Sequence, residues 1–149
     1  DPAALAEGAR WLARSAQGAT FTRYHAEAGI AAEHAFAPSF AQTRWPQIAD
    51  LYAMLERLAP SPLHTLHRAV AIAECQGPRA ALAALAGVAP PTWLAGHHLW
   101  DAVLSDLHRR AGDHARARHH GALAVEAAPT PAVKAALRRR LGITGDGAP

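Results

Sequence analysis

The sequence has no asparagine and only one lysine, one cysteine and one methionine among its 149 residues. A lone cysteine cannot form an internal disulfide, and a chain of this length buries roughly 70% of its unfolded surface without one. Only nine residues are valine or isoleucine, which argues against a large β-sheet. The longest apolar stretches fall far short of the roughly 18 residues of a transmembrane helix, so no membrane span is expected.

Alanine and arginine are abundant instead, with 39 and 14 residues. Both are strong helix formers. Apolar residues recur at helical spacing, and caps and breakers separate the segments. They predict an all-α fold of about eight helices, over residues 2–17, 20–37, 45–59, 62–76, 79–86, 93–111, 114–128 and 131–141.

Turn residues recur at a spacing that is typical of helical repeats. Gly77 and Gly112 lie 35 residues apart, each between an apolar helix and an alanine-rich one. The turn Pro60-Ser61-Pro62 is echoed 69 residues later by Pro129-Thr130-Pro131, which is close to two units of 34 residues. A period of about 34 residues is typical of tetratricopeptide (TPR) repeats.

The repeat predicts one domain over residues 2–141, a right-handed, TPR-like array of antiparallel helix pairs. Residues 2–59 would form degenerate first helices, residues 62–141 TPR-like pairs and a capping helix, and residues 142–149 a flexible tail. A plain alanine-rich helical bundle is the alternative fold.

Particular residues are expected to pack the helices together. The small residues Ser105, Ala117, Gly121 and Ala124 would let neighbouring helices approach closely. The aromatic side chains of the helices are expected to be buried; they are Trp11, Tyr24, Tyr52, Trp93 and Trp100. Ser61 is expected to cap a helix rather than to act as a nucleophile.

A set of short motifs, taken in order, carries a family resemblance. It consists of Ala31-Ala32-Glu33-His34-Ala35, Trp45-Pro46-Gln47-Ile48, Leu51-Tyr52, Leu58-Ala59-Pro60-Ser61-Pro62, Leu66-His67-Arg68-Ala69-Val70-Ala71 and Gly77-Pro78. This arrangement resembles the C-terminal, TPR-like extension of a group of bacterial extracytoplasmic-function (ECF) sigma factors of the sigma-70 family, over about residues 1–141.

The resemblance implies a cytoplasmic regulatory module that acts in transcription initiation by protein contact. Its partners would be the sigma core regions of the same polypeptide, RNA polymerase or a regulatory protein. Promoter DNA would be bound only through regions that this chain lacks. His67 stands where the family usually has asparagine, whose amide both donates and accepts in one plane.

Polar residues on two of the predicted helices are candidates for a binding groove. In a TPR stack the first helices of successive pairs line a concave surface that is suited to an extended or helical segment. The positions expected to face it are His64, His67, Arg68, Glu74, Asp106 and Arg109. The alternative is an ordinary solvated helix face.

Charge gives a second hypothesis. The formal net charge is +3 and the sequence pI is about 9.8, because arginine takes the place of lysine. Arg138-Arg139-Arg140, together with Arg116 and Arg118, would contact phosphates if the domain binds nucleic acid. The alternative is again a solvated helix face. A third hypothesis is a stand-alone TPR scaffold that binds a peptide or small ligand.

Ten histidines raise the question of a metal or an active site. His64 and His67, or His97 and Asp101, have a spacing that presents two ligands on one helix face, but a metal needs three or four. No nucleophile elbow, P-loop, dinucleotide fingerprint or pair of Glu-x-x-His motifs occurs. We therefore expect no metal, no cofactor and no catalysis.

The first residues prompt one further expectation. No basic segment followed by an apolar run is found there, so no signal peptide is predicted. The sequence opens with Asp1-Pro2, which is a helix-start signal without an initiator methionine. We expect the chain to be part of a longer protein.

Overall fold

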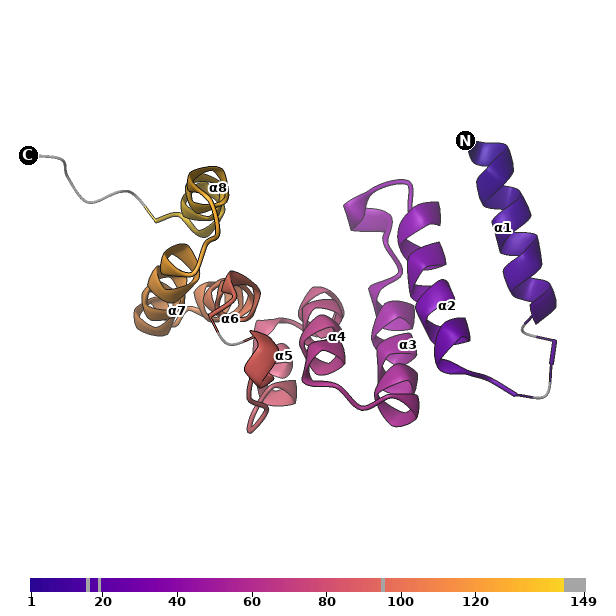
Figure 1. Cartoon of the computed structure of the whole chain (residues 1–149), viewed down its shortest axis with the longest axis horizontal. Helices are drawn as coiled ribbons and strands as arrows, with labels where there is room; N and C mark the ends of the chain where they lie inside the picture. Colours follow the sequence, from indigo (N-terminus) through magenta and orange to yellow (C-terminus); the bar gives the residue numbers. More distant parts are fainter. Residues whose placement is uncertain (16, 19, 95, 144–149) are drawn as a thin grey trace, which may run out of the picture.

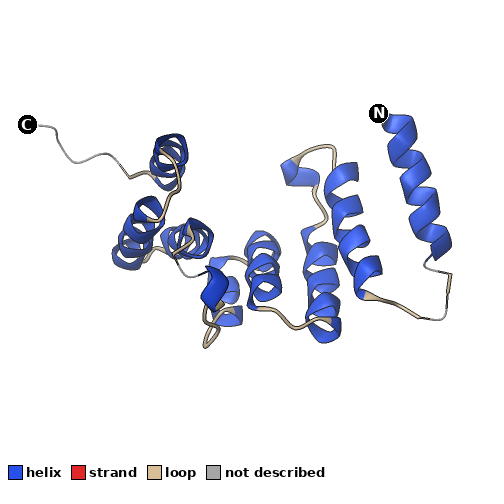
Figure 2. Cartoon of the chain, viewed as in Figure 1, coloured by secondary structure: helices blue, strands red, loops and turns tan. Residues whose placement is uncertain are grey.

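The structure is a computed structural model that describes residues 1–15, 17–18, 20–94 and 96–143. Within these ranges the regular elements are all helical and no strand is present (Figure 2). They comprise α1 (Pro2–Ser15), α2 (Arg23–Phe36), α3 (Trp45–Leu58), α4 (Pro62–Cys75), α5 (Pro78–Ala84), α6 (His98–Ala111), α7 (His114–Glu126) and α8 (Pro131–Leu141), with the short 3₁₀ helices η1 (Phe40–Gln42) and η2 (Thr92–Leu94). The expected all-α fold of about eight helices is confirmed for this part of the chain.

The helices follow one another along the long axis of the molecule, with α1 and α8 at opposite ends of the row (Figure 1). Each α-helix packs on its neighbours in sequence, and α6 also contacts α4 and α8. A row with this contact pattern is an open array rather than a closed bundle. Its assignment to the TPR class stays a prediction.

The two predicted turn patterns recur in the backbone. Gly77 and Gly112 both adopt a positive φ, of 91° and 87°, which an L side chain rarely adopts. The Ser61 hydroxyl accepts a hydrogen bond from the Leu63 amide (3.3 Å), and the Thr130 hydroxyl accepts one from the Val133 amide (3.2 Å). The structure therefore confirms Ser61 as a helix cap, and Thr130 caps α8 in the same way.

The start of α6 differs from the predicted helix over residues 93–111. Trp93 lies in η2, and α6 begins only at His98. Gly96 has a φ of 77°, which is incompatible with a continuous right-handed helix. The His97 ring then caps α6 by accepting a hydrogen bond from the Leu99 amide (3.2 Å). The apolar periodicity therefore did not indicate the helix break at Gly96, which depends on the backbone conformation of this glycine.

Buried apolar side chains form two clusters. The larger one runs from α2 to α6, and Ile48, Leu66 and Leu107 are its largest fully buried members. The smaller one joins α7 and α8 through Ala124, Val125, Leu137 and Leu141.

The small residues of α6 and α7 are buried as expected. Ser105 is a buried polar residue, and its hydroxyl donates to the Ala117 carbonyl oxygen across the α6–α7 contact (2.8 Å). Ala117, Gly121 and Ala124 are buried on the other side of this contact. Because these side chains are short, the two helices lie close together.

The expected burial of the aromatic residues is wrong in three cases. Trp11, Tyr24 and Trp93 are 61%, 66% and 68% exposed, whereas Trp100 is buried and Tyr52 is partly buried. Trp11 lies on α1, the terminal helix, so no further helix covers its outer side. Helical spacing identifies a face, but burial also requires a neighbour to cover it.

Gly142 and Ile143, the first residues of the predicted tail, belong to the folded part. Gly142 ends α8 with a φ of 66°, and Ile143 packs against the α7–α8 cluster. The rest of that prediction, residues 144–149, lies outside the described residues. In the described part, no helix is both long and apolar enough to cross a membrane.

Candidate functional site

Three of the six groove candidates lie where α4 meets α3. His64 donates from Nδ1 to the Ala59 carbonyl oxygen (2.8 Å). The His67 ring lies against the Tyr52 ring, with 5.7 Å between the centroids. Arg68 donates to the Glu56 carboxylate at 2.8 Å. These residues, the α3–α4 cluster, thus contact the preceding helix or the turn that follows it.

Burial changes the protonation behaviour of the α3–α4 cluster. The pKa of His67 is lowered, first because its ring is partly buried and second because His64 is close. Burial also raises the pKa of the Tyr52 hydroxyl. The two shifts favour the neutral forms of His67 and Tyr52, and the charge of Arg68 is balanced by Glu56.

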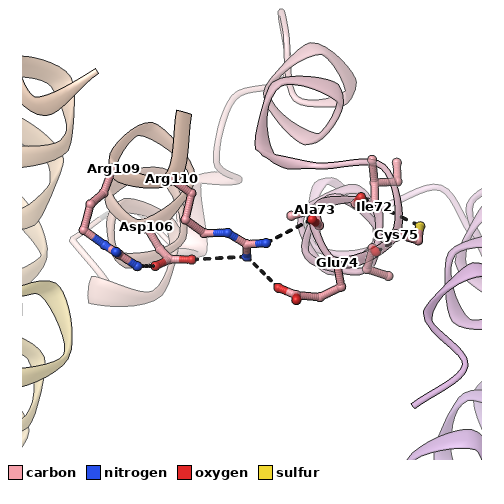
Figure 3. A network of polar contacts seen from close by, with 8 residues as sticks. Ile72, Ala73, Glu74, Cys75, Asp106, Arg109 and Arg110 are labelled. Atoms are coloured by element: carbon pink, nitrogen blue, oxygen red, sulfur yellow. Dashed lines mark hydrogen bonds and ion pairs between the residues drawn. The ribbon is translucent and has the colours of Figure 1, made fainter. Parts of the chain in front are cut away.

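The other three candidates lie together where α4 meets α6, and Figure 3 shows the contacts that link them. Arg110 contacts the Glu74 carboxylate at 2.5 Å and donates to the Ala73 carbonyl oxygen at 3.0 Å. It also lies 3.6 Å from the Asp106 carboxylate, which pairs with Arg109 as well. We call Glu74, Asp106, Arg109 and Arg110 the α4–α6 network.

Sequence reasoning missed Arg110, the residue that joins the two helices. The available signal was the spacing of four residues between Asp106 and Arg110, which places them on one helix face. In the part of the chain that the structure describes, no hydrogen bond or ion pair links the α4–α6 network to the α3–α4 cluster. The predicted groove residues therefore form two polar groups.

The candidate nucleic-acid residues lie on the last two helices. Arg116 and Arg118 are on α7, and Arg138, Arg139 and Arg140 form the last turn of α8. All five are exposed. Arg116 lies 3.5 Å from the Asp113 carboxylate. Among the described residues, no carboxylate lies within 4 Å of a guanidinium nitrogen of the other four.

A second histidine cluster joins α6 and α7. The His108 and His120 rings stack in parallel, with 5.6 Å between their centroids, and His120 contacts the Asp101 carboxylate at 2.8 Å. His108 Nδ1 is buried without a hydrogen-bond partner and lies 3.9 Å from the Asp113 carboxylate. Burial, followed by the nearby His120, lowers the pKa of His108, although Asp113 acts in the opposite direction.

This geometry makes stability depend on pH. Because the folded state binds a proton on His108 less readily than the unfolded chain, acid favours unfolding. The stability that depends on a neutral His108 is fully present above the ordinary pKa of 6.5 and is lost as the pH falls below it.

We expect the urea concentration at the unfolding midpoint to decrease when the pH is lowered from about 7.5 to about 5.5, and to decrease less in His108→Gln. The matched control is His114→Gln, because His114 is an exposed histidine on α7. An identical pH slope in the wild type and His108→Gln would contradict this assignment.

The described residues include no group of three or more histidine, cysteine, aspartate or glutamate side chains placed to hold a metal ion. Cys75, the lone cysteine, is partly buried, and its thiol donates to the Ala71 carbonyl oxygen at 3.3 Å.

Comparison with known proteins adds one relative. No family model and no solved structure matches the chain. An uncharacterised protein of Rhizobium meliloti (strain 1021) is 55% identical over 60 residues, which is 40% of this chain and 14% of the relative. The matched segment is thus a small part of a longer relative.

Proposed function

We propose that this chain is a regulatory protein–protein interaction domain of an ECF-type RNA polymerase sigma factor. It acts in the cytoplasm, in transcription initiation, by contacting the sigma core of the same polypeptide, the polymerase or a regulator. The role is binding rather than catalysis. The ordered motifs between Ala31 and Pro78, which resemble the C-terminal extension of such factors, support the sigma-factor assignment.

One structural observation supports an interaction role. Glu74 and Arg110 are 36 residues apart in sequence, yet they meet on adjacent helices of an open array. The α4–α6 network is partly exposed, with side chains between 19% and 47% accessible. The Arg109–Asp106 pair is the more exposed of the two, and such a pair contributes little to stability, about 0–1 kcal/mol. A partner of mixed charge can therefore exchange this pair for its own at small cost.

Calorimetric titration of the domain with the purified sigma core regions tests this proposal. We expect saturable one-to-one binding that weakens about tenfold, or 1.4 kcal/mol, in Asp106→Ala. Asp50→Ala is the matched control, because Asp50 is an exposed aspartate on α3. The absence of binding to both the sigma core and the polymerase would overturn docking within the polypeptide. Equal losses for the two variants would remove the α4–α6 network from the interface.

The exposure of Arg138, Arg139 and Arg140 favours contact with nucleic acid as a second candidate function. A salt series separates the two functions. Phosphate contacts lose affinity steeply with added salt, by about one power of the salt concentration for each phosphate neutralised. Binding to the sigma core is expected to weaken far less. A TPR scaffold that binds a peptide or small ligand is the third candidate function.

A further inference from the structure

Charge is distributed unevenly along the chain. Residues 114–141 carry six arginine or lysine side chains and a single carboxylate, Glu126. Residues 1–113 carry nine cationic and ten acidic side chains. All of the positive excess therefore lies on α7 and α8, at the C-terminal end of the row of helices (Figure 1).

Ion pairing does not remove this imbalance. Four of the nine arginines of residues 1–113 have carboxylate partners: Arg44 pairs with Glu33, Arg68 with Glu56, Arg109 with Asp106, and Arg110 with Glu74. In residues 114–141, Arg116 pairs with Asp113, and Arg118 has no carboxylate within 4 Å among the described residues. A negatively charged partner would supply the acidic groups that are scarce at this end of the described fold.

A pocket of about 540 Å³ opens at the same end, between the end of α6, α7 and the end of α8. Its volume falls within the roughly 300–1,000 Å³ that is typical of ligand sites. Its lining combines two arginines and a histidine with small or apolar residues; it consists of Arg109, His114, Arg118, Ala117, Ala122, Leu141, Gly142 and Ile143.

This lining discriminates between two anionic partners. Arginine binds carboxylates through paired hydrogen bonds as readily as it binds phosphates. Ala122, Leu141 and Ile143, however, form an apolar wall. Binding at this wall is favourable only for a ligand that buries an apolar group against it. A nucleic-acid backbone presents phosphates and sugars but no such group, whereas a peptide can carry both features in neighbouring residues.

We propose that the α6–α7–α8 pocket binds a short acidic peptide segment and takes one apolar side chain of that segment between Ala122 and Ile143. Arg118 holds a flanking carboxylate. The surface is separate from the α3–α4 cluster and touches the α4–α6 network only through Arg109. The proposal does not depend on the sigma-factor assignment.

Fluorescence anisotropy with a defined probe tests the proposal. The probe is a fluorescein-labelled peptide in which aspartates and glutamates flank one phenylalanine, and its partner probe has serine in place of the phenylalanine. We expect the phenylalanine probe to bind at physiological ionic strength, and the serine probe to bind about tenfold more weakly. Equal affinity for the two probes would overturn the apolar half of the proposal.

Variants of the full chain locate the site. Arg118→Glu and Ala122→Phe, which fills the pocket from an exposed position, should each weaken the phenylalanine probe about tenfold. Arg57→Glu on α3 makes the same charge change at an exposed site away from the pocket, and it should leave the affinity within about twofold. Circular dichroism and thermal melts confirm that each variant is folded. Binding that is unaffected by Ala122→Phe would overturn the proposal.

Two other ligands of this pocket would give different binding results. A DNA duplex that displaces the probe, with losses at Arg138→Ala and Arg140→Ala but none at Ala122→Phe, would replace the peptide with nucleic acid. If the probe binds only after residues 144–149 are deleted, the chain's own end is the occupant and an external peptide is overturned. These outcomes leave the titration with the sigma core unaffected, so the two proposals can fail separately.

Discussion

Replacing Gly121 by leucine is expected to lower the free energy of unfolding by about 2–3 kcal/mol. A Cβ atom at this position of α7 would lie 2.8 Å from Ile143 Cδ1 and 3.0 Å from Ser105 Oγ. Ser105 cannot retreat without losing its hydrogen bond to the Ala117 carbonyl oxygen. The added side chain must therefore separate α6 from α7 or displace Ile143 from its cluster.

Urea denaturation of Gly121→Leu and Gly8→Leu measures this effect. Gly8 is also inside a helix, but among the described residues a Cβ atom there would meet no heavy atom within 4 Å beyond its chain neighbours and the helix backbone. Leucine at Gly8 should stabilise the protein by about 0.5–1 kcal/mol, through helix propensity alone. Ile143→Ala should recover part of the loss in Gly121→Leu if the two side chains collide. Equal effects at the two glycines would show that α6 and α7 are not tightly packed at Gly121.

Leu66→Ala is the second large effect, with an expected loss of about 3 kcal/mol. Leu66 is fully buried at the centre of α4 and belongs to the larger core cluster, which α4 shares with helices on both sides. Truncation removes buried methyl groups and leaves a cavity that the neighbouring helices fill only in part.

The matched control is Leu58→Ala, at the end of α3, where the leucine is 48% exposed. Its loss should not exceed about 1 kcal/mol, because about half of the residue is already exposed to water. Comparable losses of unfolding free energy in Leu66→Ala and Leu58→Ala would contradict the assignment of Leu66 to the core. Chemical denaturation followed by circular dichroism gives both values, with the slope of each transition as a check on cooperativity.

Periodicity and caps predicted most of the helices, because both depend on residues that are close in sequence. Ser61 and Thr130 cap the helices that begin at Pro62 and Pro131, as the repeated turn pattern indicated. The break at Gly96 could not be read in the same way, because a glycine inside an apolar segment is compatible with either a helix or a turn. Only the backbone conformation decides between these two.

Burial and side-chain partners were harder to predict, since both depend on residues far apart in sequence. Trp11 has the helical spacing of a core residue, but it lies on the terminal helix of the row. The groove was predicted as one surface. In the structure, His67 lies against Tyr52 of α3, whereas Glu74 pairs with Arg110 of α6. Which helix a side chain meets depends on the rotation of each helix in the row, and sequence spacing alone does not set that rotation.

The row of helices also determines how the molecule would respond to tension along its length. The extensive helix contacts join helices that are one or two places apart, and α1 and α8 lie at opposite ends of the row. In such an array the stability is approximately the sum of the stabilities of the helices and of the contacts between neighbours. A force applied at the two ends therefore acts in series on each of these contacts along the row. The molecule is therefore expected to lengthen in steps, one helix or helix pair at a time, with the weakest junction parting first.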